Sequence, residues 1–201
     1  GPGALALLQR LADNQMDKPP GSVTYTQLLN EQGGIECDLT VTRLTADRFM
    51  LVTGSAFGLH DLAWIRSHAP ADGAVVFEDV TERLTCLGLW GPRAREILAR
   101  ATADDVSDAA FPYLTARRLG GAGVKVLALR VTYVGELGWE LYAPVEDVTT
   151  SKPSATISVW RPIDTDTFLL GTPHYPEHVD ESYWERDAER MAAAGFNTVR
   201  L

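Results

Sequence analysis

Two adjacent glycines between strand-like segments constrain the fold of this chain more than any other feature. Residues 23–30 are rich in β-branched and aromatic side chains, and residues 35–44 alternate between apolar and polar positions. Gly33 and Gly34 lie between these segments and can adopt the positive φ that a tight turn needs. The sequence therefore predicts an antiparallel hairpin over residues 23–44.

The second strand of this hairpin separates an apolar row of side chains from a polar row. Because side chains in a strand alternate between faces, one row should face the core and the other should face away from it. The expected core row is Ile35, Cys37, Leu39 and Val41. The expected polar row is Glu36, Asp38, Thr40 and Thr42. The carboxylate of Asp38 is therefore either solvated or part of a polar cleft.

Composition narrows the class of protein. The chain has 201 residues, of which 45% are hydrophobic and 22% charged, so it can bury a core as one domain or slightly more. Its net charge of −9 and its lack of a basic run argue against a nucleic-acid partner. The two cysteines, Cys37 and Cys86, are too few for a disulfide framework or a zinc site, which favours a reducing compartment. No segment is apolar enough for a membrane span. We expect a cytoplasmic protein without a metal site, and its oligomeric state is left open.

The remaining pattern alternates paired strands with single helices. Helices are expected at residues 4–11, after Ser55 as a capping residue, and at residues 93–101. The second of these should bury Leu59, Leu62, Ala63 and Ile65. Strands are expected at residues 48–54, 74–80, 84–90, 124–133 and 139–143, the last two forming a second hairpin. This order predicts an α+β fold on an antiparallel or mixed sheet, without a phosphate-binding glycine loop.

The composition changes after Pro144. Residues 146–164 are polar and contain Ser, Thr and Pro, which predicts a linker or a fusion seam. Beyond it we expect a strand at residues 168–171, a helix at residues 181–194 and a strand at residues 198–201. Such a parallel β-α-β unit is typical of the start of a barrel.

Three motifs stand in order in the first part of the chain. They read GGIECDL at residues 33–39, LGLWGPRA at residues 87–94 and YVGELGWEL at residues 133–141. With these motifs, residues 1–145 resemble the glycine-cleavage T-protein (aminomethyltransferase) family, and in particular the folate-binding region of sarcosine and dimethylglycine dehydrogenases. The resemblance implies a partial aminomethyltransferase fold that binds tetrahydrofolate and passes a one-carbon unit to it.

The resemblance also implies roles for four side chains. Asp38 matches the family's catalytic acid, and a positioned carboxylate can accept the proton that a folate amine loses on capturing an aminomethyl or iminium carbon. Glu140 matches the acid that closes the third motif, and a carboxylate can hold the amino edge of a pterin with two hydrogen bonds. Tyr25 and Tyr133 can pack against the pterin or the aminobenzoyl ring.

Without the resemblance, each of these residues has a plainer interpretation. Asp38 would be a solvated strand residue, and Glu140 would be a cross-strand charge in a hairpin. For Tyr25 and Tyr133, packing in the core and contact with a ligand explain the residue about equally well. His60 is expected on the surface of a helix.

The chain departs from the family in two respects. The family's opening segment, before residues 1–4, and the part after Pro144 are both missing from the pattern, so we expect an incomplete folate pocket. We also find no flavin-binding segment and expect no FAD site. Residues 165–201 instead resemble the start of family-42 β-galactosidases, the first strand and helix of a (β/α) barrel, without their paired catalytic carboxylates. His174 and His178 lie there on a proline-broken loop, which disfavours a metal site.

The leading interpretation is a tetrahydrofolate-dependent one-carbon transfer domain. Its small-molecule partners would be folate and an aminomethyl or iminium donor. The alternatives are a non-catalytic fusion fragment and the N-terminal piece of a β-galactosidase-type glycoside hydrolase. The extent of each resemblance separates them, because the transferase pattern covers residues 1–145 and the hydrolase pattern only residues 165–201.

Overall fold

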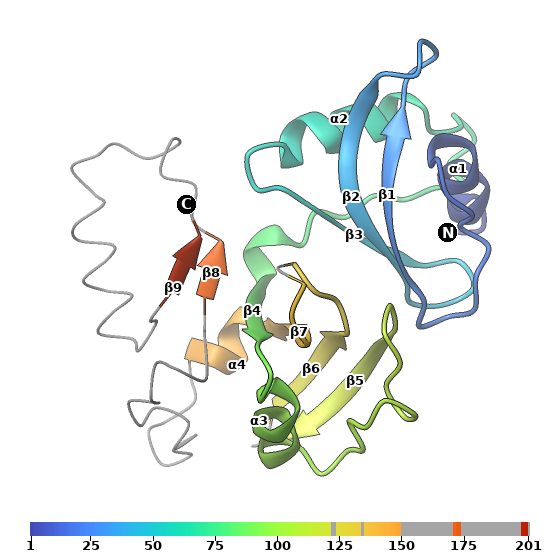
Figure 1. Cartoon of the computed structure of the whole chain (residues 1–201). Helices are drawn as coiled ribbons and strands as arrows, with labels where there is room; N and C mark the ends of the chain where they lie inside the picture. Colours follow the sequence, from blue (N-terminus) through green and yellow to red (C-terminus); the bar gives the residue numbers. More distant parts are fainter. Residues whose placement is uncertain (122–123, 134, 150–170, 174–197, 201) are drawn as a thin grey trace. The chain divides into compact units, whose positions relative to one another are not determined.

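The computed structural model describes residues 1–121, 124–133, 135–149, 171–173 and 198–200 (Figure 1). These residues form two compact units. The first contains residues 1–79 and 114–116, and the second contains residues 80–113 and the described residues from 117 onward. Within these described ranges, no helix has the length and apolarity needed to cross a membrane.

The first unit is an antiparallel sheet accompanied by two helices (Figure 1). Its elements are α1 (Ala4–Leu11), β1 (Val23–Leu29), β2 (Ile35–Arg43), β3 (Phe49–Thr53) and α2 (Gly58–Ser67). The strands pair in the order β1-β2-β3. The predicted hairpin, the strand that follows it and the helix at residues 4–11 are confirmed.

The turn between β1 and β2 is held by the side chain of Asn30. Its Oδ1 accepts hydrogen bonds from the backbone N–H groups of Gln32 and Gly34, at 3.0 and 2.8 Å. Gly33 has a φ of 79°, so it is the glycine of the pair that adopts the positive φ needed by the turn. A Cβ on Gly34 would lie 2.9 Å from Asn30 Nδ2, so the second glycine permits the close approach of the Asn30 side chain.

The register between β1 and β2 places Asp38 on the sheet face away from the core, opposite Gln27. The buried core row of β2 is Cys37, Leu39 and Val41. Ile35 was also expected in that row, but 66% of its surface is exposed. The register shifts between Leu28 and Leu29, opposite the start of β2, so regular alternation does not extend to Ile35.

The second helix begins later than expected, and its buried face agrees with the expected one at Ile65 but not at every position. Phe57 is its N-cap and no side chain caps it, so the expected role of Ser55 is wrong. Two positions that were expected to be buried, Leu59 and Ala63, are exposed. The buried side chains are Asp61 and Ile65, one helical turn apart. The helix is turned this way because Asp61 has hydrogen-bonding partners on the sheet.

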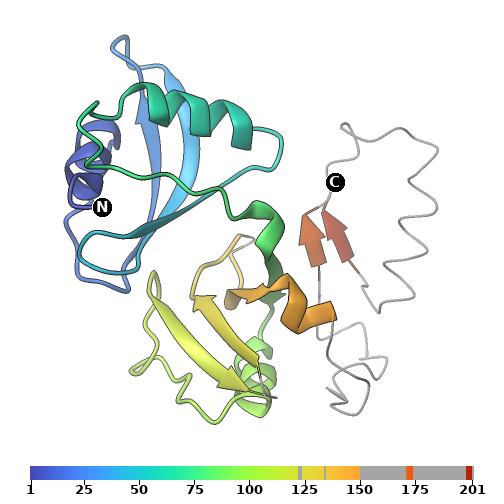
Figure 2. The ribbon, with the colours of Figure 1, turned by 180° about the vertical axis from the view of Figure 1, so that it is seen from behind.

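Residues 74–80 were expected to form a strand, and they do not. In Figure 2 this segment runs as a coil across the strands of the first unit. The Gly3 N–H donates a hydrogen bond to the Ala74 carbonyl at 3.1 Å, and Val75 and Phe77 pack against the core of the unit. The apolar side chains of the segment are therefore explained by core packing and not by strand pairing.

The second unit is built on a sheet of order β4-β7-β6-β5. Its elements are η1 (Thr81–Arg83), β4 (Leu84–Trp90), α3 (Ala94–Ala101), β5 (Ala116–Gly121), β6 (Val124–Leu129), β7 (Gly138–Pro144) and α4 (Val145–Thr149). β7 pairs antiparallel with β4 and β6, which confirms the second hairpin. β6 ends before the predicted boundary at residue 133, and β5 was not predicted.

Trp139 lies at the centre of the second unit's core and is fully buried. Its ring meets Phe111 edge to face, with 6.2 Å between the ring centroids. The guanidinium groups of Arg95 and Arg130 lie 5.4 and 5.7 Å from the centroid of the indole ring. Asp108 Oδ1 pairs with these same two arginines at 2.7 and 2.5 Å. The loop that carries Asp108 is thereby tied to the core.

Two short strands come from the last part of the chain. β8 (Gly171–Pro173) and β9 (Thr198–Arg200) pair in parallel. These strands were expected at residues 168–171 and 198–201, of which residues 168–170 and 201 lie outside the described residues. The helix expected at residues 181–194 lies outside the described residues, as do His174 and His178. The resemblance of this region to a barrel stays a prediction.

The beginning of the expected linker is helical. α4 spans Val145–Thr149, and its first turn contains Glu146 and Asp147. Acidic side chains are favourable at that end of a helix because it carries a partial positive charge. The expected linker or fusion seam at residues 146–164 stays a prediction, because residues 150–164 lie outside the described part of the chain.

Candidate functional site

Asp38 and Tyr25 project from one face of the first unit's sheet. Asp38 is exposed on β2, and its Oδ1 accepts a hydrogen bond from Nε2 of Gln27 at 3.0 Å. Tyr25 lies two residues before Gln27 on β1, so its side chain points to the same face. The side chain of Tyr25 is 58% exposed, which excludes its interpretation as a core residue. This face therefore presents an acid, an amide and an aromatic ring.

Glu36 ties the same hairpin to α2. Its Oε1 accepts a hydrogen bond from Nδ2 of Asn30 at 2.8 Å, and its Oε2 lies 3.9 Å from Nε2 of His60. The side chain of His60 is 55% exposed, which confirms its predicted place on the helix surface. Its second ring nitrogen, Nδ1, lies 2.9 Å from Oδ1 of Asp61. His60 therefore connects a carboxylate on the hairpin with a carboxylate on its own helix.

The carboxylate of Asp61 lies at the junction of α2 with the sheet and is 3% exposed. Its Oδ2 accepts a hydrogen bond from the Thr53 hydroxyl at the end of β3. The thiol of Cys37 also hydrogen-bonds to it, and burial together with the Asp61 charge raises the pKa of Cys37 to about 12. Because this thiol stays protonated and the carboxylate is well supplied with donors, the junction is structural.

Glu140 lies on β7, on the sheet face opposite the buried Trp139. Its side chain is half-buried, and its Oε2 accepts a hydrogen bond from the Tyr142 hydroxyl at 2.8 Å. Burial raises the pKa of Glu140 above its usual range, and the bond from Tyr142 offsets part of that rise. This is a carboxylate held in place at the edge of the protein interior.

The Trp90 ring lies over the sheet face that carries Glu140 because two glycines make room for it. Gly88 is the register partner of Glu140, and Gly138 is the register partner of Trp90. A Cβ on either glycine would lie only 2.0 Å from a Trp90 ring carbon. The glycines of the second and third motifs therefore allow the Trp90 ring to cover the strands on the Glu140 face.

Tyr133 belongs to the connector between β6 and β7, in the same unit as Glu140. Its side chain is 58% exposed, so the interpretation as a core residue is also wrong here. The connector turns at Gly135, which has a φ of 82°, and Glu136 beside it is exposed. Tyr133 is therefore displayed on a turn, close in sequence to the acid that the third motif contains.

The structure groups the four predicted residues in two pairs. Tyr25 and Asp38 share a sheet face in the first unit, and Tyr133 and Glu140 belong to one hairpin of the second unit. The pairing of the two hairpins with one another stays a prediction.

Three neighbours of these residues were not anticipated from the sequence: Gln27, Trp90 and Tyr142. For Tyr142 the signal existed, because it lies two residues after Glu140 in a strand and must share its face. The contact of Gln27 with Asp38 depends on the hairpin register, which the sequence alone left open. The place of Trp90 depends on glycines in two strands that are distant in the sequence.

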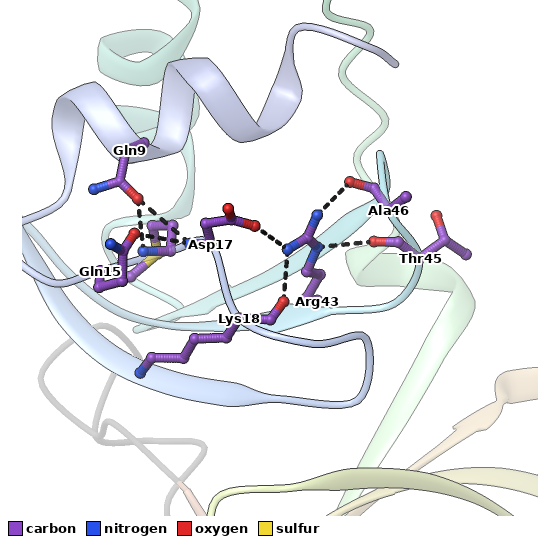
Figure 3. Close-up of polar contacts among 8 residues, drawn as sticks. Gln9, Gln15, Asp17, Lys18, Arg43, Thr45 and Ala46 are labelled. Carbon is purple, nitrogen blue, oxygen red and sulfur yellow. Dashed lines mark hydrogen bonds and ion pairs between the residues drawn. The ribbon is translucent and has the colours of Figure 1, made fainter.

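A further polar cluster in the first unit surrounds Arg43 and joins two loops (Figure 3). Nη1 of Arg43 donates to the Asp17 carboxylate at 2.7 Å and to the Lys18 carbonyl at 2.6 Å. Its Nη2 and Nε donate to the carbonyls of Ala46 and Thr45 at 2.9 and 3.3 Å. The guanidinium group is occupied by loop partners, so we assign it a structural role.

No group of His, Cys, Asp or Glu side chains is arranged to hold a metal ion within the part of the chain that the structure describes. The chemistry available at the candidate site is that of carboxylates, an amide and aromatic rings. Such groups bind and orient a planar polar ligand and exchange protons with it.

The fold and the site define an α+β domain whose outward sheet faces carry acids beside aromatic rings. The chain belongs to the GCVT N-terminal domain family, which matches residues 1–151. The resemblance to glycine-cleavage T-proteins and the related dehydrogenases, inferred from three motifs, is thereby confirmed.

Relatives of this family cover most of the described chain. Human mitochondrial dimethylglycine dehydrogenase is 38% identical over 148 residues, which are 73% of this chain and 17% of that protein. The aminomethyltransferase of Geobacillus thermodenitrificans is 38% identical over 151 residues, which are 75% of this chain and 40% of that protein.

A solved structure of the same family has a similar fold. The glycine cleavage system aminomethyltransferase T from Bartonella henselae superimposes with a TM-score of 0.59 and 28% identity, covering 74% of this chain and 39% of that chain. This chain therefore spans less than half the length of each of these three relatives.

Proposed function

We propose that this chain contains the tetrahydrofolate-binding part of a one-carbon transfer protein. The observation that carries the proposal is that both motif acids, Asp38 and Glu140, project from the sheet face opposite the core of their unit. Tyr25 and Tyr133 are both exposed. The positions of all four side chains suit contact with a ligand.

Glu140 is assigned as the anchor of the pterin ring. A pterin presents an N–H and an amino group on one edge, and an ionised carboxylate accepts two parallel hydrogen bonds from such an edge. The half-buried position of Glu140 supports this role, because a hydrogen bond to a charged group is stronger where water is partly excluded.

Asp38 is assigned as the proton acceptor. When a folate amine attacks an iminium carbon, a carbon–nitrogen bond forms and the π electrons of the iminium move to its nitrogen. The attacking amine must then lose its proton, and the carboxylate of Asp38 is the group that takes it. The bond from Gln27 to Oδ1 fixes the orientation of the carboxylate and leaves Oδ2 for the proton.

Tyr25 and Tyr133 are assigned as contacts of the aromatic rings of folate. Both side chains are 58% exposed, and offset stacking on a planar ring would cover apolar surface that water now contacts. The donor is assigned as a small molecule with an aminomethyl or iminium carbon, in keeping with relatives named dimethylglycine dehydrogenase and aminomethyltransferase.

Calorimetric titration of the full chain with tetrahydrofolate tests the proposal. We expect saturable binding by the wild type and a loss of about tenfold or more in affinity for Glu140→Gln, because the amide cannot accept both hydrogen bonds. Asp38→Asn should keep most of the affinity and abolish one-carbon transfer in an assay supplied with an iminium donor.

Two results would refute parts of this assignment. A wild-type chain that fails to bind tetrahydrofolate at millimolar concentration would contradict the folate-binding function. Unchanged affinity in Glu140→Gln would contradict the pterin anchor while leaving folate binding intact.

A further inference from the structure

Tyr142 and Glu140 form a side-chain pair that the family motif does not contain. They lie two residues apart on β7, so they share one face of the sheet. The Tyr142 hydroxyl donates to Oε2 of Glu140 at 2.8 Å. Only 8% of the Tyr142 surface is exposed, and a tyrosine buried to that extent needs a partner for its hydroxyl.

The carboxylate of Glu140 sets the direction of this hydrogen bond. Cys86 on β4 is the register partner of Tyr142. An ionised carboxylate carries no proton, so the phenolic O–H of Tyr142 donates and Oε2 of Glu140 accepts. The hydroxyl proton of Tyr142 is therefore committed to Glu140.

A carboxylate held in this way is ready for a second partner. An ionised carboxylate has about four lone-pair positions, so one bond from Tyr142 leaves enough for a ligand edge that donates two. A glutamate side chain has several rotatable bonds, and ordering it only when the ligand arrives would reduce the affinity. Tyr142 orders Glu140 in advance.

We propose that Tyr142 is a positioning residue for folate binding: its hydroxyl fixes the Glu140 carboxylate in the orientation that receives the pterin edge. This inference rests on the proposed function. Its specific content is that the ligand contacts Glu140 while Tyr142 acts through Glu140.

The same bond favours the ionised form of Glu140. The titratable groups that face Glu140 are Cys86 from β4 and Tyr142 from its own strand, while Leu129 is its register partner on β6. Burial raises the pKa of Glu140, and the hydrogen bond from Tyr142 lowers it. Loss of that bond should therefore move the Glu140 titration to higher pH.

The test compares the wild type with Tyr142→Phe, which keeps the ring and removes the hydroxyl. Carbon-13 NMR of carboxyl-labelled glutamate follows the Glu140 titration without ligand, and the resonance is assigned by its absence in Glu140→Gln. We expect a higher Glu140 midpoint in Tyr142→Phe. The tetrahydrofolate affinity should fall about fivefold to tenfold at neutral pH, and this loss should shrink as the pH rises.

Two controls separate positioning from folding. Tyr113→Phe removes the hydroxyl of a tyrosine that is 55% exposed in the same unit, and neither its Glu140 midpoint nor its affinity should change. In the Glu140→Gln background, Tyr142→Phe should have much less effect on affinity than it has alone, because the two residues act together.

Each outcome decides the inference. A wild-type affinity in Tyr142→Phe, an unchanged Glu140 midpoint, or fully additive effects in the double variant would overturn it and leave the proposed function standing. A wild-type chain that does not bind tetrahydrofolate would refute the proposed function and the inference with it.

Discussion

Asp61 shows how one buried carboxylate can determine the packing of a helix. It is 3% exposed and receives hydrogen bonds from Thr53 and Cys37, with His60 at 2.9 Å. In Asp61→Asn an NH2 group, which is a donor, replaces one of the accepting oxygens. At least one buried donor that now bonds to Asp61 would therefore lose its partner. We expect a loss of about 1–3 kcal/mol in unfolding free energy, measured by urea denaturation.

Asp38→Asn is the matched control, because Asp38 is an exposed strand aspartate of the same unit. Its unfolding free energy should stay within about 0.5 kcal/mol of the wild type. Equal stabilities for the Asp61 and Asp38 variants would contradict the structural role of Asp61.

Glu140 makes the stability of the chain depend on pH in a predictable direction. Burial raises the pKa of Glu140 in the folded state above its unfolded value. Its contribution to stability is therefore present below the unfolded value of about 4.3 and is lost as the pH rises through the folded pKa. The side chain of Glu140→Gln stays neutral at every pH. The unfolding free energy of this variant relative to the wild type should therefore increase from about pH 4, near the ordinary glutamate pKa of about 4.3, to about pH 7.

Urea denaturation of both proteins at the two pH values measures this difference. A constant difference between Glu140→Gln and the wild type would show that the folded environment does not disfavour the ionised form of Glu140.

At the scale of elements, the contact between β4 and β7 depends on two glycines, Gly88 and Gly138, which leave room for the Trp90 ring. A Cβ on Gly88 would lie 2.0 Å from a ring carbon, so Gly88→Ala must displace the indole. We expect a loss of about 1–3 kcal/mol in unfolding free energy. Gly120→Ala on β5 is the control, because nothing lies within 4 Å of the Cβ that it adds. Similar losses in both variants would contradict the account.

The loop at residues 102–113 is held by carboxylates and should loosen in acid. The backbone N–H of Gly120 lowers the pKa of Asp104, and the Arg130 side chain lowers that of Asp108. A carboxyl group whose pKa is lowered in the folded state stabilises the fold at a pH above its ordinary pKa of about 3.9. This stabilisation is lost as the pH falls through the lowered pKa.

Hydrogen exchange detected by mass spectrometry, corrected for intrinsic rates, measures this loosening. Protection of the loop should fall at acid pH more than protection of β7. Parallel loss in both segments would indicate global unfolding and contradict a local effect.

The elements with strong local signals were predictable from the sequence. The helix at residues 4–11 and the first hairpin have clear periodicity and a glycine turn, and both are present. β5 was missed because its sequence, ARRLGG, has neither alternation nor β-branched residues. The predicted buried face of α2 is confirmed at Ile65 and wrong at Leu59 and Ala63. The helix also buries Asp61, a polar residue that hydrophobic patterning places outside.

At the scale of the whole molecule, the division into two units was not predictable. Residues 114–116 join the first unit through backbone hydrogen bonds, from Ala116 N to Gly21 O at 2.7 Å and from Val23 N to Leu114 O at 2.9 Å. Contacts between segments so distant in sequence leave no local pattern. The candidate site was predictable only as residue identities, because the motifs name its acids but not Gln27 or Tyr142, which hold them.

The most direct test of the central claim is backbone NMR of the full chain with and without tetrahydrofolate. Our account predicts that saturable chemical-shift changes appear in both units, centred on Tyr25 and Asp38 in one and on Tyr133 and Glu140 in the other. Changes confined to one unit, or centred on the Arg43 cluster, would contradict it.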